Sequence, residues 1–168
     1  ANGQGNASPS AVPSSVPGTA QATPPAGQAT AAAPTREKVT VTTDVLRLTF
    51  DTEGGSLVRA EFLKHAGDTA ADGKTSTFVL LDESQSRLYV AQSGLIGGDF
   101  PNHKTAMSFS GDRELKPGQD SLTLRFESPV QGGVKLVKTY TLKRGSYDIP
   151  VRHEVVNAGE QPVKPQLY

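Results

Sequence analysis

The chain has 168 residues, enough for one domain and an appended segment. Its 17 Lys and Arg residues balance 17 Asp and Glu residues, so a nucleic-acid-binding protein, which needs a cationic surface, is disfavoured. The absence of cysteine excludes disulfides and thiolate metal sites. The longest purely apolar run, residues 78–81, is far shorter than the roughly 18 residues of a membrane span.

Residues 1–37 differ in composition from the rest of the chain. They consist almost wholly of Ala, Pro, Ser, Thr, Gln, Gly and Asn, and Arg36 is the first charged residue. Such a segment cannot bury enough apolar area to offset the entropy of ordering it. We therefore predict a disordered linker over residues 1–37 and a folded domain over residues 38–168. The chain does not begin with Met and stops as a strand pattern begins at residues 163–168, so we expect a fragment that is incomplete at its C-terminus.

Residues 39–63 predict two strands that fold back on one another over a glycine turn. Apolar and polar side chains alternate on both sides of that turn, with Leu46, Leu48 and Phe50 before it and Val58, Ala60 and Phe62 after it. Gly54 and Gly55 can take positive φ without a Cβ clash, so the chain can reverse there. The phase of the alternation slips at residues 43–45, which predicts a bulge or a sharp bend.

The same period of two continues downstream. After a loop at residues 64–76, short strands are predicted at 77–81, 87–92 and 105–110. A loop at 94–104 precedes the last of these strands, and a loop at 111–120 follows it. The clearest alternation is Leu122, Leu124 and Phe126. After a reversal at residues 129–133, the apolar positions are even-numbered up to Leu142, with Lys138 as the polar exception. A turn at 143–146 leads to a strand whose apolar face carries Ile149, Val151, His153 and Val155.

These elements predict an all-β protein. No segment after residue 38 has a convincing helical period, and strands recur about every ten residues between Gly, Pro and Asp turns. This arrangement is typical of an antiparallel β-sandwich. Pro150, Pro162 and Pro165 lack a backbone N–H, so their strands are expected at sheet edges or are interrupted there.

The polar residues do not form a recognisable catalytic or metal-binding pattern. His65, His103 and His153 lack the spacing of metal ligands. His153 precedes Glu154, but neighbouring strand residues point to opposite faces, so the two cannot converge on one substrate. Ser93 lacks the flanking pattern of a nucleophile elbow. The prediction is a domain without catalytic, cofactor-binding or metal-binding residues.

Several other features have ordinary structural explanations. The glycine pairs at residues 54–55 and 97–98 are turn formers, because no helix follows to bind a phosphate. The charged turn at 143–145 could contact lipid headgroups, although a solvated turn is the favoured interpretation. Tyr89, Tyr140 and Tyr147 are expected in the core or at its rim. With no Trp in the chain, a carbohydrate-binding module is weakly supported.

Three segments carry a family resemblance when they are taken together and in this order: TDVLRLTFDTEGGSLVRAEFL, YVAQSGLIG and KTYTLKRGSYDIPVRHEVVNAGEQPV. From about residue 38 to the C-terminus, the chain resembles the N-terminal part of the large periplasmic domain of the YidC family of bacterial membrane-protein insertases. The leader resembles the variable linker that follows the first transmembrane helix of that family.

The resemblance implies a twisted supersandwich similar to galactose mutarotase domains, located in the periplasm as part of an inner-membrane protein. It also implies a non-catalytic scaffold and docking surface for Sec translocon components (SecDF), chaperones and nascent membrane proteins. The family's insertase core lies in transmembrane segments absent from this chain, so no insertase residue can be carried over.

Two alternatives remain open. Fold analogy alone suggests a carbohydrate-binding or mutarotase-like sugar-modifying domain, and a secreted adhesin-like sandwich is a third reading. Titration with aldoses would test the sugar reading. A transmembrane helix upstream in the intact protein would favour the insertase over the adhesin.

Overall fold

The structure is a computed structural model in which residues 34–168 are described. Residues 1–33, most of the predicted linker, lie outside the described residues. The described residues form eleven strands and no helix, which confirms the all-β prediction. One sheet contains, in order, β1 (Lys38–Thr42), β2 (Leu46–Asp51), β3 (Ser56–Thr69), β4 (Thr75–Glu83) and β5 (Leu88–Tyr89). A second contains β10 (Val151–Asn157), β9 (Val134–Lys143), β8 (Ser121–Glu127) and β7 (Ser108–Ser110), and β11 (Gln166–Leu167) pairs with β6 (Leu95–Ile96).

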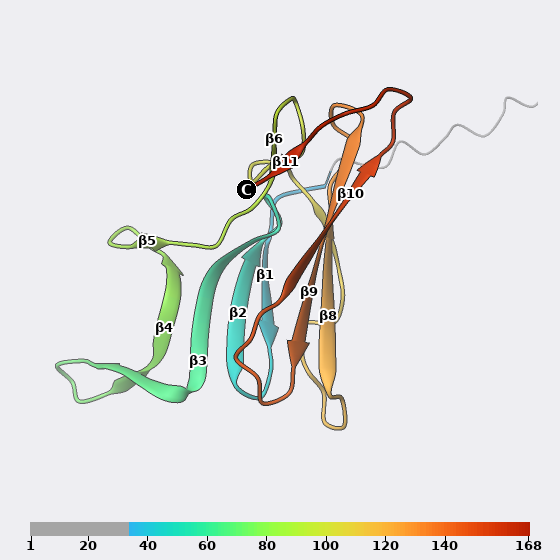
Figure 1. Cartoon of the computed structure of the whole chain (residues 1–168). Coiled ribbons are helices and arrows are strands. Elements are labelled where there is room, and N and C mark those ends of the chain that lie inside the picture. Colours follow the sequence, from blue (N-terminus) through green and yellow to red (C-terminus); the bar gives the residue numbers. More distant parts are fainter. Residues whose placement is uncertain (1–33) are drawn as a thin grey trace, which may run out of the picture. The chain divides into compact units, whose positions relative to one another are not determined.

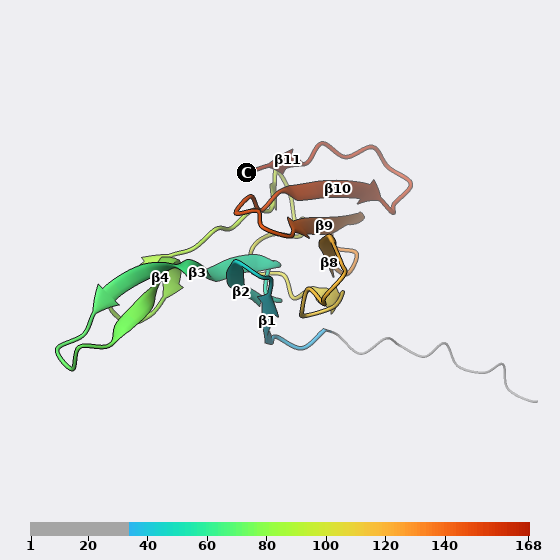
Figure 2. The same cartoon turned by 90° about the horizontal axis from the view of Figure 1, so that it is seen from below.

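The two larger sheets pack face to face over one hydrophobic core (Figures 1 and 2). The apolar residues of β1 and β2 face those of β8 and β9. At the centre, the ring of Phe50 lies 5.4 Å from that of Phe126 and 4.8 Å from that of Tyr140. The Tyr140 hydroxyl donates a 2.8 Å hydrogen bond to the Gly55 carbonyl, which links the sheets directly. The predicted antiparallel sandwich is therefore present.

The hairpin predicted around the glycine pair is confirmed as β2 and β3. Leu46 pairs with Phe62 and Leu48 with Ala60. The expected bend at residues 43–45 is a complete reversal, so residues 39–51 form two antiparallel strands. The hydroxyl of Thr43 accepts hydrogen bonds from the backbone N–H groups of Val45 and Leu46, which closes that turn.

The loop predicted at residues 64–76 is mostly strand, so that prediction is wrong. β3 continues to Thr69 and β4 begins at Thr75, with the reversal confined to the residues between them. Figure 2 shows this ribbon extending beyond the β8–β10 layer. Because no second sheet covers its tip, the ribbon needs no apolar alternation, and its pairing is interrupted by three register shifts. Its polar sequence therefore resembled a loop.

Three smaller boundaries also differ from the sequence prediction. The strand expected at 87–92 is shortened to β5, and the one expected at 105–110 is shortened to β7. The loop expected at 94–104 contains the short strand β6. β6 pairs with a segment about 70 residues later, and local periodicity cannot reveal such a partner. The edge position inferred from Pro150 is confirmed, because β10 lies at the end of its sheet.

Candidate functional site

An apolar groove opens on the β3–β4 ribbon, with a volume of about 530 Å³. We call it the aromatic groove, and it is lined by Phe62, His65, Ala66, Phe78 and Tyr147. The rings of Phe62 and Tyr147 are stacked, with centroids 5.4 Å apart and planes 7° apart. The ring of Phe78 meets that of Phe62 edge-on at 5.6 Å. Tyr147, from the β9–β10 connection, therefore joins the two sheets at this point.

The aromatic groove is open to solvent. Phe78 is 42% exposed and Tyr147 is 38% exposed, while Leu80 on the same strand is 40% exposed. Large apolar side chains that gather on one exposed surface are typical of a binding site, whereas scattered ones are ordinary. Aromatic rings held by mutual stacking also provide contact area without further loss of conformational entropy on binding. The groove is therefore suited to an apolar side chain of a partner.

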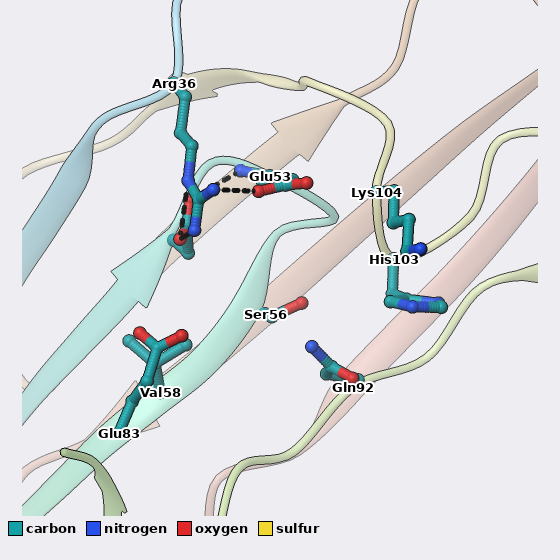
Figure 3. A pocket seen from close by; sticks show the side chains of 9 residues that line it. Arg36, Glu53, Ser56, Val58, Glu83, Gln92, His103 and Lys104 are labelled. Atoms are coloured by element: carbon teal, nitrogen blue, oxygen red, sulfur yellow. Dashed lines mark hydrogen bonds and ion pairs between the residues drawn. The ribbon is translucent and has the colours of Figure 1, made fainter. Parts of the chain in front are cut away.

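A second, polar hollow of about 220 Å³ lies beside the Gly54–Gly55 turn (Figure 3). Arg36 reaches it from the segment preceding β1. Its guanidinium contacts the carboxylate of Asp51 at 2.8 Å and that of Glu53 at 2.5 Å. Arg36 belongs to the predicted linker, yet its side chain is paired with the end of β2. The acids of this hollow are thus already neutralised by neighbouring cations.

Asp51 and Ser56 are the buried polar side chains of this hollow. Burial alone would raise the pKa of Asp51, but hydrogen bonds from Arg36, the Glu53 backbone N–H and Lys38 lower it overall. The Ser56 hydroxyl is buried and has no hydrogen-bond partner among the described residues. A polar hollow of this size has room for water, and one ordered water is enough to satisfy such a hydroxyl without any ligand.

A third cluster surrounds a lysine in the core. Lys138 is 0% exposed, and its ammonium donates a 2.7 Å hydrogen bond to the carbonyl of Ser93. His153 lies opposite Lys138 on β10, and its Nε2 is 2.7 Å from the Ser93 hydroxyl. Burial lowers the pKa of Lys138 to about 8. Burial and the charge of Lys138 lower the pKa of His153, which favours the neutral imidazole.

The structure separates the three histidines. His65 lies in the aromatic groove, and the His103 Nδ1 is 2.5 Å from the Tyr168 hydroxyl beside the polar hollow. His153 contacts Ser93, whereas Glu154 faces the other side of the sheet, where its carboxylate is 3.4 Å from the guanidinium of Arg152. Within residues 34–168, no three His, Asp or Glu residues gather in a way that could hold a metal ion.

The remaining singled-out residues have local roles. Gly54, Gly55 and Gly97 have positive φ in turns, as expected of turn formers. Tyr140 is in the core, Tyr147 is at its rim, and Tyr89 is exposed, so the core-or-rim expectation is wrong for Tyr89. The contact between Ser93 and His153 was missed, because the two residues are 60 positions apart and neither carries a motif. Lys138 was the one cluster member visible in the sequence, as an interruption of an apolar face.

Comparison with known proteins identifies a family and several relatives. The family model "YidC periplasmic domain" matches residues 38–168. The proteins named "Membrane protein insertase YidC" from Ralstonia nicotianae and Cupriavidus metallidurans are 47% and 46% identical over 86% and 99% of this chain, respectively. That from Bordetella petrii is 50% identical over 79% of the chain. These alignments cover 25%, 29% and 23% of the relatives, so the chain spans about a quarter of their length. Residues 34–168 contain no candidate for a membrane-spanning helix.

Proposed function

Because this chain belongs to the YidC periplasmic domain family, we propose that it is the docking and scaffold portion of a membrane-protein insertase at the periplasmic face of the inner membrane. Its task is to hold partner proteins near the site of insertion. The observation that carries this proposal is the aromatic groove, an exposed apolar surface formed by Phe62, Phe78 and Tyr147 on a well-packed sandwich.

The partners we propose are periplasmic parts of the Sec translocon, SecDF in particular, together with chaperones and nascent membrane proteins. An aromatic groove of this size accommodates one or two apolar side chains. Partners anchored in the same membrane gain a high effective concentration, so a small contact is sufficient for association.

The proposed role is non-catalytic. The Ser93–His153 contact is the arrangement nearest to a nucleophile with its base, but a functional pair also needs a group that orients the histidine. In the described part of the chain, the adjacent carboxylate of Glu154 is on the opposite face. A polar hollow without an aromatic platform likewise gives no support to the sugar-modifying alternative.

Site-directed photo-crosslinking in the full-length insertase tests the docking role. A photoreactive amino acid replaces Phe78 in the aromatic groove or, as a control, Thr123 on the exposed outer face of β8. We expect adducts with SecDF from position 78 and none from position 123. Equal adduct yields from both positions, or none from either, would contradict the proposed groove.

Deletion of residues 38–168 from the full-length protein tests the accessory character of the domain. We expect insertion of model membrane proteins to persist and co-purification of SecDF to fall. Loss of insertion from a deletion protein that remains folded and abundant would show that the domain is essential to insertion itself. Uniformly unmoved NMR signals on titration with aldoses would remove the sugar-binding alternative.

A further inference from the structure

The residues just before β1 are bonded to the end of β2. The buried hydroxyl of Thr52 accepts a 2.8 Å hydrogen bond from the backbone N–H of Glu37, and the backbone N–H of Thr52 donates a 3.0 Å bond to the Glu37 carbonyl. The same hydroxyl lies 3.4 Å from the Thr35 carbonyl. We call residues 35–38 the strap, because these contacts continue the pairing of β1 with β2 beyond the first residue of β1.

A buried carboxylate at the end of β2 binds the charged side chains of the strap. The side chain of Asp51 is 4% exposed, and its Oδ2 accepts hydrogen bonds of 2.8 and 3.1 Å from the guanidinium of Arg36. The same oxygen lies 3.2 Å from the ammonium of Lys38, which also forms an ion pair with Glu83 of β4. Asp51 Oδ1 accepts the backbone N–H of Glu53 at 2.8 Å. A carboxylate this buried is screened less than a surface charge, so its bonds to the strap are stronger than ordinary surface ion pairs.

The turn to which the strap is bonded is also held from its other side. The backbone N–H of Gly54 donates a 2.7 Å bond to the Thr105 carbonyl, and a Cβ added at Gly54 would lie 2.5 Å from the His103 carbonyl oxygen. Figure 3 shows the turn between Arg36 on one side and His103 on the other. The strap therefore binds a turn that has its own support within the sandwich.

We propose that the strap is a conformational lock, held by the charge of Asp51, that fixes the direction in which the chain enters the sandwich. The rigid part of the domain then begins at Thr35, three residues before the family match begins at Lys38. Ordering these residues costs conformational entropy, which their hydrogen bonds and ion pairs have to offset. The competing interpretation is a freely moving segment whose surface charges pair only transiently.

The strap and the aromatic groove lie at opposite ends of the first sheet. Lys38 pairs with Asp51 at one end of the β1–β2 pair, and Leu46 pairs with Phe62 of the groove at the other. Figure 1 shows β1 running between these two ends. A locked strap thus fixes the direction of the groove relative to the entering chain. This consequence rests on the docking role proposed above, whereas the lock itself does not.

Amide hydrogen exchange of the 168-residue chain, followed by NMR, tests the lock without involving the groove. We expect the Glu37 amide to be protected in the wild type and to exchange about tenfold faster in Asp51→Asn, while the amides of β8 and β9 keep their rates. The matched control is Asp72→Asn, which removes an exposed carboxylate 3.4 Å from the ammonium of Lys74 and should change Glu37 exchange by less than about twofold. An unprotected Glu37 amide in the wild type, or equal rates in Asp51→Asn and the wild type, would overturn the proposal.

A second variant keeps the test decisive if Asp51→Asn does not fold. Arg36→Gln alters a side chain that is 57% exposed, so the sandwich should stay folded and the β8 and β9 amides should again keep their rates. We expect exchange of the Glu37 amide to rise about threefold, less than in Asp51→Asn because Lys38 still binds Asp51. Exchange of Glu37 at the wild-type rate in Arg36→Gln would show that charge does not hold the strap.

Discussion

Replacing Lys138 with Met should remove the free energy that desolvating this charged side chain costs the folded state at neutral pH. The side chain is fully buried between Phe126 of β8 and His153 of β10 in the strand register, and burial lowers its pKa from 10.5 to about 8. Each unit of pKa difference corresponds to about 1.4 kcal/mol, so keeping the ammonium charged in the folded state costs about 3 kcal/mol below pH 8. Methionine has a similar length and no charge to desolvate.

The sign of the pH dependence follows from proton counting. Between about pH 8 and 10.5 the unfolded chain keeps the Lys138 proton and the folded chain loses it, so the free energy of unfolding of the wild type rises with pH. Linkage gives a gain of about 2 kcal/mol between pH 7 and pH 9.5. The Lys138→Met variant lacks this gain.

At pH 7 two terms compete in the variant. Removing the charge recovers about 3 kcal/mol, while leaving the Ser93 carbonyl without its donor costs about 1–3 kcal/mol. We therefore expect the free energy of unfolding to be unchanged or raised by up to about 2 kcal/mol.

Urea unfolding at pH 7, 8.5 and 9.5 measures both effects. Since the chain has no Trp, far-UV circular dichroism is the appropriate signal. The difference between variant and wild type is the quantity to compare, because the other titrating groups then cancel. An identical pH slope in the two proteins, or a loss of more than about 3 kcal/mol at pH 7, would refute the assignment of a destabilising charge to Lys138.

Three further predictions address the core, the glycine turn and the inter-sheet hydrogen bond. Phe50→Ala should lower the free energy of unfolding by about 3–5 kcal/mol because it removes the central ring, while Thr123→Ala on the outer face should change it by less than about 0.5 kcal/mol. Gly54→Ala should lower the midpoint temperature of unfolding more than Gly73→Ala does. Both glycines have positive φ, but only at Gly54 would the added Cβ lie 2.5 Å from the His103 carbonyl oxygen. Tyr140→Phe should cost about 1–2 kcal/mol by leaving the Gly55 carbonyl unpaired. Because burial raises the pKa of Tyr140 to about 12, wild-type stability should fall above pH 10, and urea titrations should show that this fall is smaller in the variant.

The period of two in the sequence was sufficient for the strands that form the core. In β2, β8 and β9 every predicted apolar position is buried, because each strand has one face against the other sheet and one against water. The β3–β4 ribbon escaped prediction for the opposite reason. Its outer half has no sheet across from it, so its pairing rests on backbone hydrogen bonds that leave no periodic trace in the side chains.

The candidate sites were less predictable than the strands. The aromatic groove combines Phe62 with Tyr147, and the lysine cluster combines Ser93 with Lys138 and His153. Each joins a strand to a loop or a distant strand, so its existence depends on how the sheets pack and not on any local spacing. The sequence did mark Lys138, since a lysine in an otherwise apolar series is a local conflict with the fold.

Alternation also conceals a distinction that bears on function. β9 and β10 show the same inward apolar series, yet Leu136 and Tyr140 are buried while the opposite residues Val155 and Val151 are exposed. The alternation therefore predicts which face of a strand is apolar. Only the structure shows whether residues 34–168 themselves bury that face. Where the two disagree, at β10 and along the β3–β4 ribbon, apolar side chains of the described residues remain exposed to water. Water-exposed apolar area of this kind is stabilised when polypeptide packs on it, which is the physical basis for proposing the aromatic groove as a docking surface.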